Sequence, residues 1–455
     1  MSAVTVGAEV LPATYLQQEW VAAVGAEESN HNIPHAIEIT GPLDLDHLAA
    51  VLAALVERHE TLRTAFVRTA GGIAQRVTAP FRPGWELEDL SHLPRPARRA
   101  ALERLAVRRC EQTTDLFTPP LWSAVVVRMA PGHHVLLTVW HHAVFDGWSN
   151  AVLLRDVHQL YRARLDPTYP PPAAVPVQPG DYAAHERTIG LGAHAGFWGE
   201  QSAADPPRLP RERTGPGDPL WLEAHPLPLL GAETTGPLLR IGARHGAKPA
   251  STLRALVLAS LTPYLGDDVT IGCVTANRDV PGLAHTLGLV SDHVPVRVDL
   301  RDDPSFGRLA GRVHEATRQA HRHRVPVGVL RHELPGAARR GGSLFDISIN
   351  YLPHAPGRAA TITVPDGGTV TMRQLTLPTT ALRPRMATAF SGAVPLGFQL
   401  HHAHEGHVSG DLWAHRPAFA SRTIDELTGN LGRTAREVLA APGRGIRGLA
   451  VRGRG

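Results

Sequence analysis

The sequence contains very little lysine and cysteine and no long apolar run, and each scarcity excludes a class of protein. Lys248 is the only lysine, so arginine carries nearly all of the positive charge. Two cysteines, Cys110 and Cys273, exclude a disulfide framework and a cysteine-rich zinc site. We interpret both as buried free thiols. The sequence has neither a membrane-spanning apolar stretch nor a signal-like N-terminus, so we expect a cytoplasmic protein that does not contact membranes.

The composition is otherwise that of a globular protein with more than one core. Hydrophobic residues make up 43% and charged residues 19% of the chain, which excludes an intrinsically disordered protein. At 455 residues the chain is longer than an ordinary single core requires, so we expect two domains.

Positive charge is spread along the chain rather than concentrated in one patch. The formal net charge is +4, and the last basic cluster runs from Arg444 to Gly455. No aromatic residues interleave with these arginines, which argues against nucleic-acid binding, and we predict a basic, disordered tail at 443–455. A mildly basic surface still suits an acidic partner protein through electrostatic steering.

The spacing of apolar residues predicts a mixed α/β fold of the α+β kind, with strands and helices in irregular order. A helix capped by Asp44 or Asp46 is among the clearest elements. Ser251 or Thr252 is expected to cap a second one. Further helices are predicted at 14–24, 96–113 and 424–440, and strands at 33–40, 65–69, 73–77, 121–129, 135–140, 269–276, 294–298, 344–351 and 396–401.

A proline-dense segment at 166–180 is the best candidate for a crossing between two lobes. We therefore predict an N-terminal lobe at 1–175 and a C-terminal lobe at 176–442. A second loop-like segment, 205–219, is expected to wrap the surface.

The stretch most suited to chemistry begins at Thr138 and ends at Ser149. An apolar strand stops there at His141 and His142, and Asp146-Gly147 follows before a helix that Ser149 or Asn150 would cap. A neutral imidazole accepts a proton near pH 7, and a helix N-terminus favours developing negative charge. These residues by themselves fit a catalytic turn and a structural strand end equally well.

Metal binding is the main chemical alternative for the histidine-rich stretches. His141, His142 and Asp146 are an awkward ligand set, because adjacent strand residues point to opposite faces. A second cluster, His401 to His407, contains Glu405-Gly406, which is typical of a hairpin turn with exposed histidines. We predict no metal site. A nucleophile elbow, a P-loop and a dinucleotide fingerprint are also missing from the sequence.

Several stretches, taken in order, resemble the condensation domains of nonribosomal peptide synthetases. His141 to Gly147 matches the His-His-x-x-x-Asp-Gly signature, and Arg58 to Phe66 matches a second family motif. Looser matches are 181–183, 197–198, 276–278 with Gly288, 295–297 and 344–351. The resemblance covers about 11–439. The signature alone is shared with other acyltransferases similar to chloramphenicol acetyltransferase, whereas the set of motifs is much more specific.

The resemblance implies two chloramphenicol-acetyltransferase-like lobes set in a V with a central tunnel. It implies a condensation enzyme that joins an acyl or aminoacyl thioester to an amine or alcohol. No adenylation or carrier module is visible in the sequence, so we expect a stand-alone enzyme. The thioester would arrive on the phosphopantetheine arm of a donor carrier protein, and no cofactor would be bound by the chain itself. The acceptor would be free or held on an acceptor carrier protein. We expect a monomer.

The resemblance also assigns roles to individual residues. His142 would be the active-site histidine, acting either as a base or as a positioning group, and Gly147 would border the acceptor channel and place an N–H near the intermediate. His141, Asp146 and Arg278 would support the site, with Asp146 paired to Arg278. The candidates for the substrate tunnel are Trp148, Ser149, Asp292 and His293.

Three departures from the family pattern affect the acceptor and lobe-contact details. Asp292 replaces an asparagine, Arg322-His-Arg324 replaces His-Gln-Asp, and the first motif, Leu11 to Trp20, lacks its arginine. Glu405-Gly-His407 resembles an epimerisation-domain motif without its companions. Two alternative functions remain open: an acyltransferase that uses an acyl-CoA donor, and a non-catalytic member that recruits carrier proteins.

Overall fold

The computed structural model describes residues 8–23, 31–202, 209, 221–334, 344–353, 359–364, 367–377, 386–387, 396–403, 405–415 and 418–450. The chain divides into two compact units. Unit 1 comprises Met1–Thr188, Ala276–Ser291 and Pro356–Pro384, and unit 2 comprises Ile189–Thr275, Asp292–Ala355 and Arg385–Gly455. Among the described residues, none of the helices combines the length and the apolar character that crossing a membrane requires.

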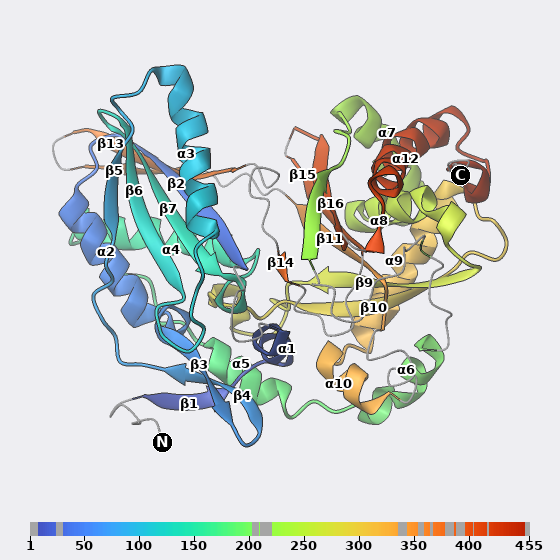
Figure 1. Ribbon diagram of the computed structural model, residues 1–455, viewed down its shortest axis with the longest axis horizontal. Coiled ribbons are helices and arrows are strands. Elements are labelled where there is room, and N and C mark those ends of the chain that lie inside the picture. Colours follow the sequence, from blue (N-terminus) through green and yellow to red (C-terminus); the bar gives the residue numbers. More distant parts are fainter. Residues whose placement is uncertain are drawn as a thin grey trace. The chain divides into compact units, whose positions relative to one another are not determined.

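Unit 1 is built on a six-stranded sheet and a smaller three-stranded one (Figure 1). The large sheet has the order β12-β13-β2-β7-β6-β5, and its strands pair antiparallel except for the parallel pair β5 and β6. The small sheet has the order β1-β4-β3. The strands are β1 (Glu9–Pro12), β2 (Asn32–Thr40), β3 (Thr64–Thr69), β4 (Gly72–Val77), β5 (Glu86–Asp89), β6 (Trp122–Ala130), β7 (His133–His141), β12 (Ala360–Thr363) and β13 (Thr369–Leu375).

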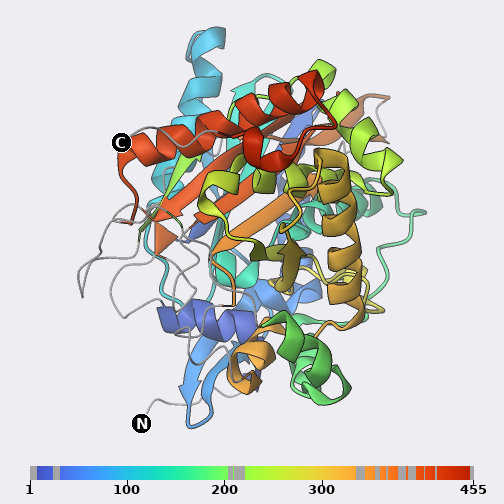
Figure 2. The ribbon, with the colours of Figure 1, turned by 90° about the vertical axis from the view of Figure 1, so that its right-hand side faces the viewer.

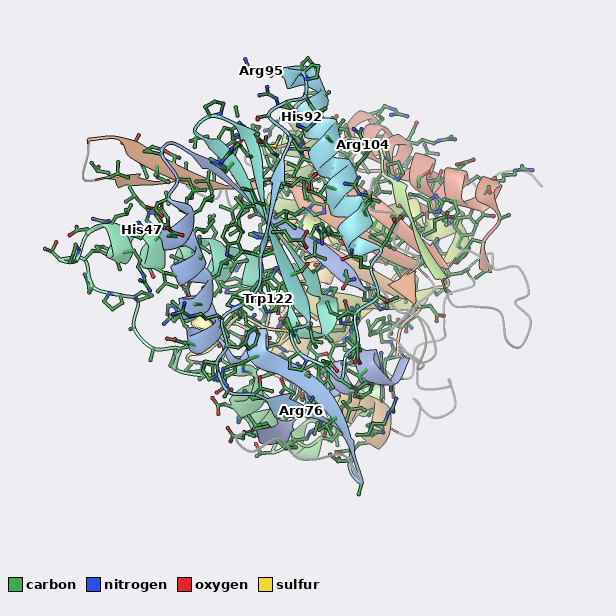
Figure 3. All side chains as sticks on the ribbon, turned by 60° about the vertical axis from the view of Figure 1, so that its left-hand side comes forward. His47, Arg76, His92, Arg95, Arg104 and Trp122 are labelled. Carbon is green, nitrogen blue, oxygen red and sulfur yellow. The ribbon has the colours of Figure 1, made fainter. Side chains whose placement is uncertain are left out.

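Helices cover both faces of the six-stranded sheet, because β7 is apolar on both sides. Leu136 and Trp140 pack with α2 (Leu45–Arg58) and α4 (Ser149–Leu165), while Val135 and Leu137 pack with α3 (Arg95–Cys110). Arg95 and Arg104 lie on α3 in Figure 3. Unit 1 also contains α1 (Tyr15–Ala23), α5 (Pro179–Glu186) and the 3-10 turns η1 (Glu60–Arg63), η2 (His142–Val144) and η5 (Leu283–His285).

Unit 2 is built on a seven-stranded mixed sheet of order β10-β9-β11-β15-β16-β8-β14. Its central strands β9, β11 and β15 run parallel to one another. The strands are β8 (Trp221–Pro226), β9 (Asp268–Thr275), β10 (Asp292–Asp299), β11 (Ile347–Pro353), β14 (Met386–Ala387), β15 (Leu396–His402) and β16 (Val408–His415).

Helices of unit 2 pack against this sheet, and Figure 2 looks onto α9 and α12 of this layer. Its core helices are α7 (Ala232–Arg244), α8 (Pro249–Ser260), α9 (Phe306–Arg322) and α12 (Ser421–Ala440). Smaller elements are α6 (Ala195–Gln201), α10 (Val327–Glu333) and the 3-10 turns η3 (Gly192–His194), η4 (Thr262–Tyr264) and η8 (Ile446–Gly448).

The predicted mixed α/β class is confirmed, and most predicted elements are present within a few residues of their expected limits. Asp44 caps α2, since its Oδ1 accepts the His47 N–H at 2.9 Å. Gly406, at a φ of +86°, lies in the predicted turn between β15 and β16. The segment 205–219 falls outside the described residues, apart from Leu209.

The capping predictions for two helices differ from the structure. Lys248 occupies the N-cap position of α8, and neither Ser251 nor Thr252 caps it, because the helix already begins at Pro249. At α4, Ser149 is the first helical residue and its N–H is bound by Asp146. Short polar residues inside a first turn give the same sequence signal as a true cap.

The compact units differ from the continuous lobes predicted at 1–175 and 176–442. The proline-dense segment 166–180 belongs to unit 1, the chain first passes to unit 2 at 188–189, and 276–291 returns to unit 1. Arg58 explains the first difference, because its guanidinium donates to the carbonyl of Pro172 at 3.3 Å. The lobe division itself stays a prediction.

Part of the segment predicted as a disordered tail is ordered. Ile446 is buried in η8, its N–H donates to the Pro304 carbonyl at 3.1 Å, and Leu449 is buried as well. These apolar side chains, placed between the arginines, give the segment a reason to pack. Residues 451–455 lie outside the described part of the chain.

Candidate active site

The histidine loop, residues 141–149 of unit 1, follows the end of β7. Its first two N–H groups are hydrogen-bonded to carbonyls of two neighbouring segments. The His141 N–H donates to the Leu121 carbonyl at 2.9 Å, and the His142 N–H donates to the His31 carbonyl at 2.7 Å. The chain then forms η2 and reaches α4 at Ser149. The loop is therefore fixed by the sheet on one side and by a helix start on the other.

His141 holds the turn that follows it. Its ring is fully buried, and Nδ1 accepts the Ala143 N–H at 3.1 Å. Burial lowers the pKa of His141 well below its usual value, and the neighbouring rings of His31 and His142 lower it further. A neutral ring is required for Nδ1 to accept that bond, so geometry and charge state agree.

His142 is half-buried and keeps an unused ring nitrogen. Its ring lies against Trp20, with centroids 4.6 Å apart and planes inclined by 38°. Nδ1 is buried and has no hydrogen-bond partner in the described part of the chain. Burial lowers the pKa of His142, although carbonyl oxygens of His142 and Phe145 and the charge of Asp146 oppose this effect. The ring is thus neutral at pH 7 and able to accept a proton.

Asp146 is only 1% exposed, and both of its carboxylate oxygens are fully used. Oδ1 accepts from the N–H and hydroxyl of Ser149 at 3.0 and 2.9 Å and from Arg278 at 3.1 Å. Oδ2 accepts the N–H groups of Val290 and Ser291 at 3.3 and 3.2 Å. The ion pair that the resemblance implied is therefore present. A carboxylate with five donors has no capacity left to orient a histidine.

Arg278 fastens the segment 276–291 onto the histidine loop. Besides Asp146, its guanidinium donates to the carbonyls of Ala276 at 2.7 Å and of Thr286 and Gly288 at 3.3 Å. The preceding Asn277 has a left-handed φ of 54°, which turns the chain sharply out of β9. We call 276–291 the strap, since it closes over Asp146 from a distant part of the sequence.

The residues after Asp146 occupy different environments. Gly147 is exposed, and its carbonyl accepts the Asn150 side-chain amide at 3.1 Å. Trp148 is 43% exposed, with its indole N–H bonded to the Ala284 carbonyl of the strap at 3.2 Å. Ser149 is fully buried, and its hydroxyl accepts the Gly288 N–H at 3.0 Å. Ser149 therefore acts as a structural link to the strap.

Asp292 and His293 belong to unit 2, where both side chains are buried. Asp292 binds the first N–H of α10, at Val327, through Oδ2 at 2.9 Å. His293 stacks on Phe345 with centroids 5.4 Å apart, and its Nε2 lies 3.2 Å from the Ser348 hydroxyl. Burial lowers the pKa of His293 to about 3, so this ring is neutral.

The motif from Arg58 to Phe66 supplies a charge network that anchors α4 behind the loop. Asp156 is fully buried, and its carboxylate lies 2.8 Å from His59 Nε2, 2.7 Å from Arg58 Nε and 2.7 Å from Arg155 Nε. Burial raises the pKa of Asp156, but the hydrogen bonds from these three partners outweigh it and leave the pKa lowered. The motif therefore has a structural explanation.

Two buried side chains hold η2 from other elements. The Thr61 hydroxyl donates to the Val144 carbonyl at 2.9 Å, and the Gln17 amide donates to the Ala143 carbonyl at 3.1 Å. The carbonyls of this turn would otherwise lack partners inside the protein. Thr61 belongs to the second family motif and Gln17 to the first, so both motifs converge on the loop.

Sequence reasoning missed the aromatic surroundings of the histidines. Trp20 of α1 contacts His142 and also lies edge-on to His31, with centroids 4.5 Å apart. The predicted helix 14–24 and the first motif, Leu11 to Trp20, both contain Trp20, but helical spacing does not indicate which side chain its ring contacts. Among the described residues, no group of three or more His, Cys, Asp or Glu side chains is arranged to hold a metal ion.

Comparison with known proteins places this architecture in a family. Residues 8–384 match the family model of the condensation domain. The phosphinothricin tripeptide synthetase PhsC of Streptomyces viridochromogenes is 32% identical over 300 residues, which is 64% of this chain and 27% of PhsC. The chondramide synthase cmdD of Chondromyces crocatus is 29% identical over 324 residues, 70% of this chain and 8% of that protein. The chain thus spans about a quarter or less of the length of these two relatives.

Solved structures agree over almost the whole chain. An X-domain from teicoplanin biosynthesis has a TM-score of 0.79 at 25% identity and covers 99% of both chains. The SgcC5 protein from Streptomyces globisporus has a TM-score of 0.78 at 21% identity, covering 95% of this chain and 100% of that one, and shows the fold alone. The chain belongs to the condensation-domain family of nonribosomal peptide synthesis.

Proposed function

We propose that the chain is a stand-alone acyltransferase of nonribosomal peptide or related biosynthesis. It forms an amide or ester bond between a carrier-bound acyl or aminoacyl thioester and an amine or alcohol. The observation that carries this proposal is the contrast at the histidine loop. His142 is neutral and only half-buried, so part of its ring is open to a substrate, while Asp146 is buried and saturated with donors.

The reaction needs little from the protein beyond alignment and one proton acceptor. The acceptor nitrogen or oxygen attacks the thioester carbonyl, so that a C–N or C–O bond forms and the C–S bond breaks. The proton lost by the acceptor passes through His142 to the departing thiolate. The Gly147 N–H, next to the start of α4, stabilises negative charge on the carbonyl oxygen. A thioester is already activated, so no protein nucleophile is required.

The other candidate site residues differ in the exposed fraction of their side chains. Among the four proposed tunnel residues, Trp148 has the largest exposed fraction, so we propose it as a direct substrate contact. Ser149 shapes the loop through the strap, and Asp292 and His293 shape the substrate path through their contacts within unit 2. His141, Asp146 and Arg278 support the loop without touching the substrate.

The partners follow from the family. A donor carrier protein presents its acyl group on a phosphopantetheine arm, and the acceptor is a free small molecule or a second carrier protein. One structural neighbour is a four-domain nonribosomal peptide synthetase, holo-AB3403, with a TM-score of 0.76 at 18% identity. This likeness shows the fold, and the partner assignment rests on the family itself.

Intact-mass measurement of loaded carrier proteins tests the proposal directly. The chain is incubated with aminoacyl- or acyl-loaded carrier proteins and a panel of amines and alcohols. His142→Ala is expected to lower product formation by about 10²- to 10⁴-fold without changing the thermal midpoint. His92→Ala, a change at an exposed histidine of the same unit, is the matched control. Equal turnover with acyl-CoA donors would favour the CoA-dependent alternative.

A docking function is the second candidate, because the X-domain neighbour has also been solved as a complex with OxyB, at 26% identity and a TM-score of 0.75. A docking member binds a partner protein whether or not its histidine is present. If His142→Ala leaves product formation by the assembled system unchanged, the catalytic proposal is wrong and the docking function is favoured.

A further inference from the structure

Arg254 is a buried positive charge without a partner in the described part of unit 2. It lies in the first half of α8, where all residues from Ser251 to Ser260 are buried, and 7% of its surface remains exposed. Its Nε is buried with no hydrogen-bond partner, and no carboxylate in the described part of the chain forms an ion pair with it. A guanidinium removed from water normally has a carboxylate or several carbonyls beside it.

Two neighbours of Arg254 are polar but uncharged side chains. Its positive charge lowers the pKa of Cys273 on β9 and of Tyr351 on β11, so it lies near both side chains. In each case burial is the larger effect and leaves the pKa raised, so the thiol and the phenol are both neutral at pH 7. The charge of Arg254 is therefore not cancelled by either neighbour.

A hydrogen-bonded pair extends this polar group onto the next strand. The Tyr351 hydroxyl lies 2.9 Å from Nδ1 of His402 on β15. Burial lowers the pKa of His402, as does the nearby His407, so the imidazole is neutral as well. The histidine cluster that stood out in the sequence thus contributes one ring to this place, and its role there is not explained by the histidine loop of unit 1.

The parallel strands β9 and β11 separate near Cys273 and Tyr351. Pairing between the parallel strands β9 and β11 covers only three positions, ending at Cys273 and Ile349. Both strands continue beyond it, β9 to Thr275 and β11 to Tyr351 and further. In mixed α/β sheets, ligands bind where parallel strands separate at their carboxyl ends. The unpaired guanidinium and the Tyr351–His402 pair both belong to this end of the sheet.

From these observations we infer that unit 2 carries a binding site for a small carboxylate, with Arg254 as its charged ligand and Tyr351 as its hydroxyl donor. In this arrangement Nδ1 of His402 carries the ring proton and donates it to the Tyr351 oxygen, which leaves the single O–H of Tyr351 for the carboxylate. The planar fork of a guanidinium matches a carboxylate, and one positive charge balances one carboxylate. A phosphate dianion would leave negative charge unbalanced beside Arg254, because Cys273, Tyr351 and His402 are neutral and supply no second positive charge. The inference goes beyond the proposed function and does not depend on it.

Binding of propionate to the full chain tests the inference without any measurement of catalysis. The probe is propionate labelled with ¹³C at the carboxyl carbon, followed by NMR line broadening in low-chloride buffer and by thermal unfolding. The expected Kd is on the order of 1 mM, with a rise in the thermal midpoint of about 2 °C at saturating propionate. Propionamide, which has the same shape without the charge, is expected to give neither effect.

Two substitutions make the test specific. Arg254→Leu is expected to raise the Kd at least tenfold while leaving the ligand-free thermal midpoint unchanged or higher, since a buried unpaired charge is removed. Arg244→Leu, at an exposed arginine of the neighbouring α7, should leave the Kd unchanged. Tyr351→Phe should raise the Kd by a smaller factor, through loss of one hydrogen bond.

Three results with propionate would overturn the inference. They are the absence of propionate binding to the wild-type chain, binding that survives Arg254→Leu, and an equal loss in Arg244→Leu. Inorganic phosphate is the remaining arm of the experiment. If phosphate binds through Arg254 more tightly than propionate does, the site exists for a different anion and the carboxylate assignment is wrong.

Discussion

Asp146 in unit 1 and Arg254 in unit 2 are both charged side chains with less than a tenth of their surface exposed, yet their surroundings are opposite. Asp146 accepts five hydrogen bonds, from Ser149, Arg278 and two N–H groups of the strap. Arg254 donates none to the described residues. The hydrogen bonds to Asp146 fix the backbone around it, whereas the unpaired charge of Arg254 can be balanced by a bound ligand.

The two adjacent histidines repeat this difference at shorter range. His141 is fully buried and uses Nδ1 to hold the turn, whereas the ring of His142 is only half-buried. The loop is held by groups other than His142, namely His141, Gln17, Thr61 and Asp146. We propose that His142 and Arg254 are available for chemistry or binding because side chains other than these hold the surrounding scaffold.

The largest expected effect comes from opening the closed network around Asp146. Arg278→Ala leaves a buried carboxylate without its cation and is expected to cost about 3–5 kcal/mol of unfolding free energy. Chemical denaturation measures this loss, and activity should fall with it. Arg301→Ala is the contrasting control, because its ion pair with Asp299 is exposed and its loss should leave the unfolding free energy almost unchanged.

Asp146→Asn removes the negative charge from the same network and keeps the side-chain shape. An amide nitrogen cannot accept the strap N–H groups, so the variant should also be less stable. Full stability of both Asp146→Asn and Arg278→Ala, combined with lost activity, would contradict the structural role of the pair and place Asp146 in the chemistry.

A smaller effect is expected from His35 of β2, a buried ring whose two nitrogens have no hydrogen-bond partner among the described residues. Burial lowers the pKa of His35 from 6.5 to about 4. The unfolded chain therefore binds this proton first as the pH falls, and stability present above pH 6.5 is lost between pH 6.5 and 4. The loss is roughly 3 kcal/mol for this ring alone.

Denaturant titrations at about pH 7.5 and about pH 4.5 measure that loss, and His35→Leu should reduce the difference between them. Leucine fits the apolar core formed with Phe145 and Trp140, so the variant is expected to fold. The exposed ring of His92 serves as the control, since its substitution should leave the pH dependence unchanged. An undiminished difference in His35→Leu would show that other groups carry the acid sensitivity.

The elements that recur at fixed spacing were predictable from the sequence, and the contacts between distant segments were not. Periodicity located α2, the β3–β4 hairpin and the apolar strands β7 and β9, because each reflects a local pattern of burial. The strap was not predictable, since Asn277 must adopt a left-handed φ to bring 276–291 back to unit 1.

In the candidate site as well, some features could be predicted from the sequence and others could not. The histidine loop was visible in the sequence, and the Asp146–Arg278 pair followed from the family resemblance. The Trp20 contact and the burial of Arg254 were hidden, because helical spacing predicts which face is buried but not which polar group will lack a partner there. Ser149 gave the signal of a cap and is instead a link to Gly288.

The smallest expected effect concerns Trp20, whose ring lies against the open His142. Burial lowers the pKa of His142. An indole face stabilises a positive charge, so we expect Trp20, which contacts the ring, to favour the imidazolium. Trp20→Leu should therefore lower that pKa further. The acid limb of the kcat/KM profile, already below pH 6.5 in the wild type, would move down by up to about one pH unit.

The pH profile separates this role from simple packing. Trp122 on β6 (Figure 3) has the same exposed fraction as Trp20, 7%, and stacks on Trp140 rather than on a histidine. Trp122→Leu should lower stability without moving the acid limb, and Trp20→Phe should keep most of the wild-type profile because a benzene face remains. If Trp20→Leu reduces activity equally at every pH, the indole packs against His142 without changing the pKa of that ring, and this prediction is wrong.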